Sequence, residues 1–273
     1  MGIVDNIQSA LDTWNRYLGE IWTLLSTSPQ DFRGGGIWDV IREVNGSLQA
    51  IGYALLVLFF VIGLVKHTTS LSEIKRPEVA LRFFLRFAIA KAVITYGMDI
   101  MVGVFDISQG VIQAIVGNIG APTPATVPQE IVDAVGSLGI LDKVGVWAVS
   151  LIGSLVIIVL SIIMLYTVYA RFIRLYIYTA ISPIPLSTFA GQGVSQTGAA
   201  FLKSYAAVCL EGAVIVLACI IFSAFASAPP MVDPGATASQ MVWSYIGQLA
   251  FNLLVLTGSV KLANMTIKEM LGL

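Results

Sequence analysis

Few side chains of this chain are of the types that carry out chemistry. Its 273 residues include a single histidine, His67, and two cysteines, Cys209 and Cys219. The cysteines are ten residues apart in one apolar run, about 15 Å along a helix, which is too far for a disulfide. The sequence contains no cluster of cysteines and histidines and no phosphate-binding loop or catalytic motif. It therefore indicates no metal site, no cofactor and no enzymatic activity.

Two acidic residues, Asp99 and Glu211, lie inside long apolar runs. An ionisable group within the hydrocarbon of a bilayer costs about 2.5 kcal/mol or more, so such groups usually face a bundle interior or water. Three interpretations stay open for these acids. They couple transport to protons or ions, they form interhelical hydrogen bonds, or they line the wet interior of an oligomer.

The composition is that of an integral membrane protein. Apolar residues make up 57% of the chain and charged residues 11%, and the mean hydropathy is +0.86. Soluble domains have about 45–50% apolar residues and about 25% charged residues. The net charge of −1 gives no overall attraction to nucleic acid. These values exclude a soluble enzyme, a disulfide scaffold and a disordered tail.

Apolar helices of about 20 residues are long enough to cross a bilayer. Five stretches meet this criterion: 48–65, 87–105, 144–170, 204–225 and 242–260. We therefore expect an all-α, polytopic bundle with about five transmembrane helices, in a domain covering residues 37–273.

A sixth apolar stretch, Leu175 to Ala190, is shorter and is interrupted by Pro183 and Pro185. Two prolines so close together remove two amide donors and break a helix. A broken backbone is tolerated at membrane depth only where protein or water surrounds it. We therefore predict a re-entrant hairpin on the cytoplasmic side, over about residues 175–197.

The distribution of charge predicts the orientation of the spans. Segments assigned to the cytoplasm hold 11 basic and 3 acidic residues, while the other segments, 106–143 among them, hold 4 basic and 11 acidic residues. The N-terminus is thus expected outside and the C-terminus inside. The cytoplasmic basic flank consists of Lys75, Arg76, Arg82, Arg86, Arg171 and Arg174. Four tyrosines fit an interfacial belt with the last two arginines: Tyr166, Tyr169, Tyr176 and Tyr178. Base stacking of these side chains on single-stranded DNA stays open as an alternative.

Residues 1–36 form a segment with a different pattern. Apolar residues from Ile3 to Leu25 recur at three- and four-residue spacing opposite charged ones, which is typical of an amphipathic helix. Pro29 marks its end, and Gly34 to Gly36 form a hinge. The polar face is mainly acidic, so we expect this extracytoplasmic helix to pack on neighbouring subunits or partner proteins rather than on lipid.

The stretch from Arg171 to Gly191, with the sequence RFIRLYIYTAISPIPLSTFAG, resembles the TrbL/VirB-type polytopic subunit of conjugative type IV secretion systems, especially the short variants of Gram-positive mobile elements. The resemblance implies a non-enzymatic, oligomeric channel component in the bacterial cytoplasmic membrane that assists translocation of a DNA–protein substrate. It also implies other secretion-system membrane subunits and a cytoplasmic ATPase as partners, together with transient contact with translocating single-stranded DNA. The long soluble C-terminal extension of many members has no counterpart in this sequence.

Two other functions remain open at this point. A small-solute or ion transporter or permease subunit would use Asp99 and Glu211 for coupling. A membrane scaffold would use neither residue.

Overall fold

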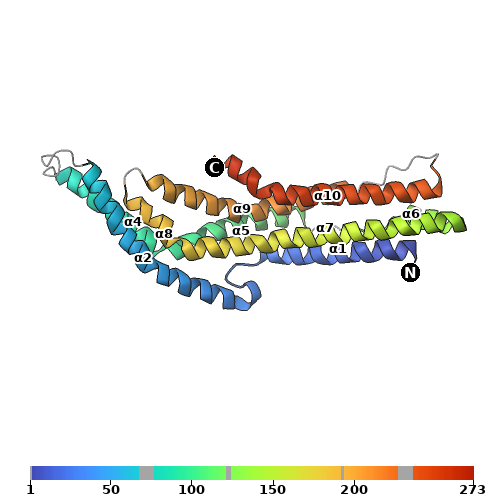
Figure 1. Cartoon of the computed structure of the whole chain (residues 1–273), viewed down its shortest axis with the longest axis horizontal. Coiled ribbons are helices and arrows are strands. Elements are labelled where there is room, and N and C mark those ends of the chain that lie inside the picture. The colour runs from blue at the N-terminus through green and yellow to red at the C-terminus, as the bar shows by residue number, and fades with distance from the viewer. Residues whose placement is uncertain (1, 68–76, 121–123, 192–193, 227–235) are drawn as a thin grey trace. The chain divides into compact units, whose positions relative to one another are not determined.

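The computed structural model describes residues 2–67, 77–120, 124–191, 194–226 and 236–273, and within these ranges all regular structure is helical (Figure 1). The elements are α1 (Ile3–Ser26), η1 (Phe32–Gly35), α2 (Gly36–His67), α4 (Pro77–Thr95), α5 (Gly97–Ile119), α6 (Gln129–Gly136), α7 (Ile140–Ile181), α8 (Pro183–Leu186), η2 (Ser187–Ala190), α9 (Ser195–Ala226) and α10 (Ala238–Met270).

Five helical stretches of the described residues are long and apolar enough to cross a membrane. They are Phe32–Val65, Gly97–Asn118, Ile140–Ile181, Ser195–Ser223 and Ala238–Met270. The predicted all-α polytopic bundle with five spans is thereby confirmed.

The second span begins later than the sequence suggested. The expected stretch 87–105 runs across the end of α4 at Thr95 and the start of α5 at Gly97. Hydropathy does not reveal this boundary because apolar residues continue on both sides of it. As a result Asp99 lies in the first turn of α5. Asp106, which we expected in an extracytoplasmic loop, lies within α5 instead.

The long helix α7 joins two segments that the sequence appeared to separate. Its 42 residues include the third predicted span and continue through Leu175 to Ile181. A helix of this length measures about 63 Å, against a hydrocarbon core of about 30 Å. Helix α7 ends at Ile181, and Pro183 occupies the first position of α8, a place that a proline ring accepts. The short turns of α8 and η2 follow as far as Ala190, and Gly191 is extended. That this segment re-enters the membrane stays a prediction.

The chain packs as two compact units. The first contains residues 1–26, 112–170 and 212–263. Its core joins Ile7 and Leu11 of α1 to Ile131 of α6, Val146 of α7 and Ile246 of α10. The apolar face of α1 is thus buried within its own chain. The expectation that this face docks on other proteins was wrong, because intramolecular helices already cover it.

The second unit contains residues 27–111, 171–211 and 264–273. It begins with the predicted glycine hinge, where Gly34 and Gly35 adopt φ of 77° and 82°, values that favour glycine. Two small cores hold it together. One surrounds Phe105, Leu175 and Tyr205, and the other surrounds Leu56 and Leu186. All the sequence-predicted site residues that the structure describes lie in this unit.

Candidate functional site

The proline turn, which we define as residues Ser182 to Gly191, packs closely against α2. Pro183 and Leu186 are buried. A Cβ atom on Gly52 of α2 would lie 2.8 Å from the carbonyl oxygen of Pro183, closer than carbon atoms approach oxygen without displacement. The glycine at position 52 therefore allows the two backbones to come together.

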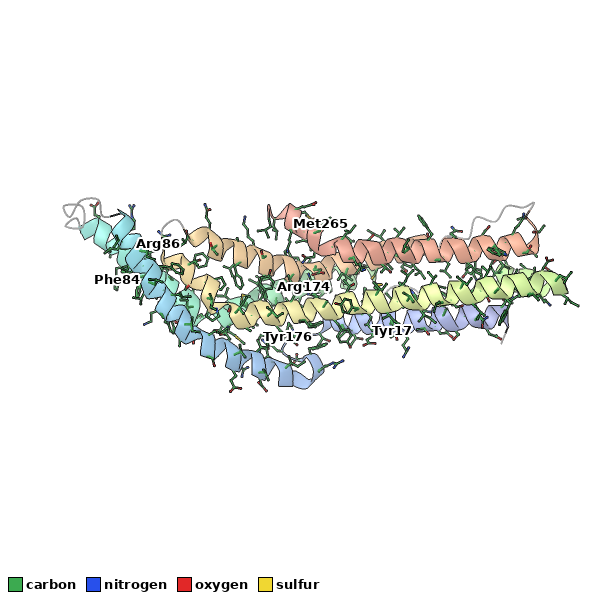
Figure 2. The ribbon with its side chains drawn as sticks, in the orientation of Figure 1. Tyr17, Phe84, Arg86, Arg174, Tyr176 and Met265 are labelled. Carbon is green, nitrogen blue, oxygen red and sulfur yellow. The ribbon has the colours of Figure 1, made fainter. Side chains whose placement is uncertain are left out.

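Polar side chains from α2 and α4 satisfy the backbone at both ends of the proline turn. Asn45 Nδ2 donates hydrogen bonds to the carbonyl of Thr179, at 2.7 Å, and to Ser182 Oγ, at 3.0 Å. At the other end Arg86, labelled in Figure 2, donates from Nε to the Phe189 carbonyl and from Nη2 to the Gly191 carbonyl, at 3.1 and 3.2 Å.

A third polar side chain, Gln49 of α2, donates hydrogen bonds at the boundary between α4 and α5. Its Nε2 donates to the carbonyls of Ile94 and Thr95 at 3.1 and 3.2 Å. Unsatisfied backbone groups are costly in an apolar environment. Both interruptions in the helices of this unit therefore receive hydrogen bonds from α2.

A buried charge cluster forms where α7, α9 and α10 meet in the second unit, and we define it as Arg171, Arg174, Glu211 and Asn264. Arg174 Nη2 lies 2.7 Å from Glu211 Oε1, and Asn264 Nδ2 donates to Oε2 at 3.3 Å. The side chain of Glu211 is 1% exposed and that of Arg174 34%. Glu211 is therefore a paired interhelical group, the second of the three interpretations offered above.

Arg171, expected in the cytoplasmic basic flank, is fully buried within the chain. Its Nε donates to the Val208 carbonyl at 3.2 Å and its Nη2 to the Cys209 carbonyl at 2.9 Å. The guanidinium carbon lies 5.8 Å from the ring centre of Phe105. Nη1 has no hydrogen-bond partner among the described residues. A side chain in this position cannot stack on passing DNA bases.

The structure describes Arg82, Arg86 and Arg174 among the other members of the predicted basic flank, while Lys75 and Arg76 lie outside the described residues. Arg86 is partly buried against the proline turn, and Arg82 is exposed. The predicted tyrosine belt is wrong for Tyr176, which is buried and whose hydroxyl donates to the Pro29 carbonyl at 2.9 Å. A count of basic residues along the chain does not show which of them face protein.

One face of α5 is polar although the helix is a candidate span. We define the polar face of α5 as Asp99, Gly103, Asp106 and Gly110, which recur at spacings of four and three residues. Both aspartates and Gly110 are exposed, and a Cβ atom on either glycine would meet nothing within 4 Å. Further along the helix, Gln113 and Gly117 continue the same register. The opposite face carries Met101, Phe105 and Ser108, all buried.

The sequence contained a signal for this face that a hydropathy average conceals. Spacings of three and four residues place the members of the set within about 60° of one another around a helix of 3.6 residues per turn. Val111, one residue beyond Gly110, lies about 100° away from it and is 40% exposed. No comparable signal identifies Asn45 or Gln49, because their partners are about 45 to 137 residues distant.

These features define the class of the protein. It is a polytopic helical membrane protein with helix interruptions that receive side-chain hydrogen bonds, a buried charge cluster and an exposed polar helix face. No group of three or more metal-ligating side chains occurs among the described residues. The profile of the family described as TrbL/VirB6 plasmid conjugal transfer like protein matches residues 14–183. This match covers more than half of the chain, and the chain belongs to that family.

Membership makes the chain a multi-pass membrane component of conjugal transfer, in a family of structural membrane subunits rather than enzymes. The match includes Pro183 and ends there, so it contains all of α7, the helix that leads into the proline turn. No curated protein and no solved structure matches the chain.

Proposed function

We propose that this chain is an oligomeric channel component of a conjugative type IV secretion system, and that the polar face of α5 lines a water-filled path through the membrane. The channel assists translocation of a DNA–protein substrate across the bacterial cytoplasmic membrane. Family membership supports a role in conjugal transfer, and the polar face of α5 supports the role as a channel component.

The exposed aspartates of α5 carry this proposal. Two carboxylates turned toward lipid would together cost about 5 kcal/mol or more. No ion pair joins Asp99 or Asp106 to any described residue, and no helix of the described chain buries either side chain. Water in the interior of an assembly removes this cost, and the two glycines of the face, Gly103 and Gly110, leave that side of the helix open.

The proposal includes an orientation and a set of partners. The unequal distribution of charge favours an extracytoplasmic N-terminus and a cytoplasmic C-terminus. Other membrane subunits of the secretion system and a cytoplasmic ATPase complete the machine, because the chain offers no nucleotide-binding motif of its own. Among the members of the basic flank that the structure describes, Arg82 is exposed and available to such partners.

The transporter alternative receives less support. It requires Asp99 and Glu211 to act together as coupling groups. Glu211 is buried and paired with Arg174, whereas Asp99 is exposed on α5. The two acids therefore occupy different environments, and Glu211 already has a structural partner.

A mating assay with an in-frame deletion strain tests the proposal. We expect transfer to be lost and then restored by the complementing gene, with growth and solute uptake unchanged. The same protein, purified in detergent, is expected to have the mass of an oligomer. Normal transfer by the deletion strain, or a monomeric particle from cells that transfer normally, would contradict the proposal.

A further inference from the structure

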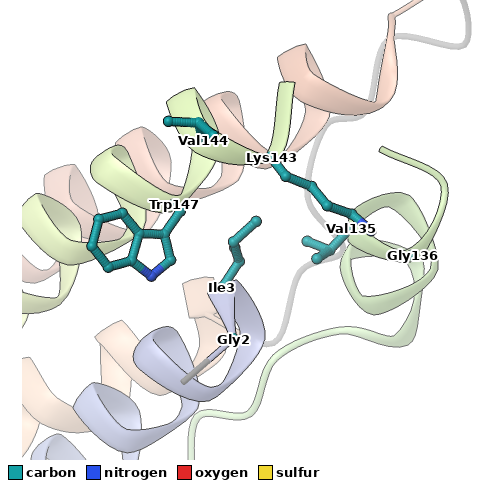
Figure 3. A pocket seen from close by; sticks show the side chains of 7 residues that line it. All are labelled: Gly2, Ile3, Val135, Gly136, Lys143, Val144 and Trp147. Atoms are coloured by element: carbon teal, nitrogen blue, oxygen red, sulfur yellow. The ribbon is translucent and has the colours of Figure 1, made fainter. Parts of the chain in front are cut away.

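An apolar pocket opens in the first unit between the start of α1, the end of α6 and the first turns of α7. Its volume is about 690 Å³, within the range of about 300–1,000 Å³ usual for ligand pockets. Figure 3 shows its lining, which consists of Gly2, Ile3, Val135, Gly136, Lys143, Val144 and Trp147. All but Lys143 present apolar surface or bare backbone.

Charge and surroundings identify the class of ligand. Figure 3 shows the Lys143 side chain extending beside Val135 and Gly136, and its amine forms no ion pair within the described part of the chain. On the same first turns of α7, Ile140 and Leu141 are 86% and 90% exposed, which fits contact with lipid rather than water. Lysine and tryptophan together are typical of the membrane interface.

We propose that this pocket binds one acyl chain of an anionic phospholipid, with the headgroup phosphate held by Lys143. The apolar walls take the hydrocarbon, and the ammonium group supplies the one positive charge that a phosphate at the rim requires. This site is separate from the α5 face and does not depend on channel activity. It rests only on the membrane location of the chain.

Quenching of Trp147 tests the site directly, with the full-length protein in detergent. Phosphatidylglycerol or phosphatidylcholine brominated in the acyl chains is added, and the contribution of Trp147 is the difference between the wild type and Trp147→Phe. We expect half-maximal quenching at about fivefold less phosphatidylglycerol than phosphatidylcholine, because one lysine near a lipid surface contributes about that factor. Lys143→Gln should abolish this preference, whereas Lys261→Gln, at an exposed position, should preserve it.

A filling variant separates the pocket from ordinary contact with surrounding lipid. A Cβ atom on Gly136 or on Gly145 would meet nothing within 4 Å, but only Gly136 lines the pocket. Gly136→Leu should therefore abolish the quenching of Trp147, and Gly145→Leu should leave it unchanged. Three results would overturn the proposal. They are no quenching of Trp147 in the wild type, quenching that persists in Gly136→Leu, and an unchanged headgroup preference in Lys143→Gln. Lys143 is exposed, so Lys143→Gln should fold, and its result stands even if Gly136→Leu fails to fold.

Discussion

Replacing Arg174 by methionine should destabilise the protein strongly, because it removes the ion-pair partner of the buried Glu211 and leaves its hydrogen bond from Asn264. Glu211 is 1% exposed and its contact with Arg174 is 2.7 Å. Removing one partner of a buried ion pair typically costs about 3–5 kcal/mol. The reverse change, Glu211→Gln, should cost less, about 1.5–3 kcal/mol, because the side chain of Arg174 is 34% exposed and is therefore less desolvated than that of Glu211.

The free cysteines of the chain offer the assay. Cys209 and Cys219 are both buried, so a thiol-reactive dye reports thermal unfolding of the detergent-purified protein. A loss of about 3–5 kcal/mol should lower the Tm by roughly 6–20 °C if the chain follows the scaling of domains of 150–250 residues. The exposed pair Arg42–Asp39, at 3.9 Å with side chains 67% and 76% exposed, provides the matched control. Arg42→Met should cost less than about 1 kcal/mol.

A double-mutant cycle decides whether the two charges interact as the structure indicates. The variant carrying both Arg174→Met and Glu211→Gln should lose about 2 kcal/mol less stability than the two single variants lose together. This coupling free energy is within the range for residues in contact. Additive losses, or a Tm for Arg174→Met equal to that of Arg42→Met, would refute the assignment of this pair as a buried, coupled interaction.

Three further predictions concern the proline turn and its supports. Gly52→Ala should reduce both Tm and transfer frequency, because its Cβ would lie 2.8 Å from the Pro183 carbonyl oxygen. The Cβ of Gly46→Ala, on the same helix, meets nothing within 4 Å, so this control should change neither quantity. Equal behaviour of the two variants would contradict the close packing. Asn45→Leu should lower stability by about 1–3 kcal/mol, measured by the same thermal assay, since it leaves buried groups unpaired; an unchanged Tm would show that the turn needs no such support. Arg86→Lys should reduce transfer frequency, because an ammonium group cannot reproduce the contacts of two guanidinium nitrogens with the carbonyls of Phe189 and Gly191. Arg82→Lys, at an exposed position, should transfer normally. A greater loss of transfer in Arg82→Lys than in Arg86→Lys would contradict this assignment.

Hydropathy and local pattern predicted the helical class, the five spans and the amphipathic character of α1. These features depend on residues close together in the sequence, such as the apolar positions from Ile3 to Leu25. The same reasoning placed the end of α1 near Pro29, and the structure ends it at Ser26. It did not predict the boundary between α4 and α5, because no proline or charge interrupts the apolar residues around Tyr96.

The candidate site was harder to predict because its partners are distant in the sequence. Arg171 and Arg174 have the spacing of an interfacial belt, and only the packing of α9 against α7 brings Glu211 and the Cys209 carbonyl to them. Asn45 likewise meets the end of α7 through the fold alone. Asp106 was misplaced for a different reason: an average over a span treats its charge as the end of the helix, although it continues a polar face.

Water should reach the polar face of α5 during transfer, and cysteine labelling measures this directly. Donor cells carrying Gly110→Cys or Val111→Cys, with Cys209 and Cys219 replaced by alanine, are treated with a charged, membrane-impermeant thiol reagent during mating. Gly110 lies on the polar face, and its replacement keeps both aspartates. Val111 is also exposed but lies about 100° away, on the apolar side of the helix. We predict that the reagent labels Gly110→Cys and reduces its transfer toward that of the deletion strain, while Val111→Cys stays unlabelled and transfers normally. Equal labelling of the two positions, or transfer by fully labelled Gly110→Cys at the untreated frequency, would contradict a water-filled path along α5.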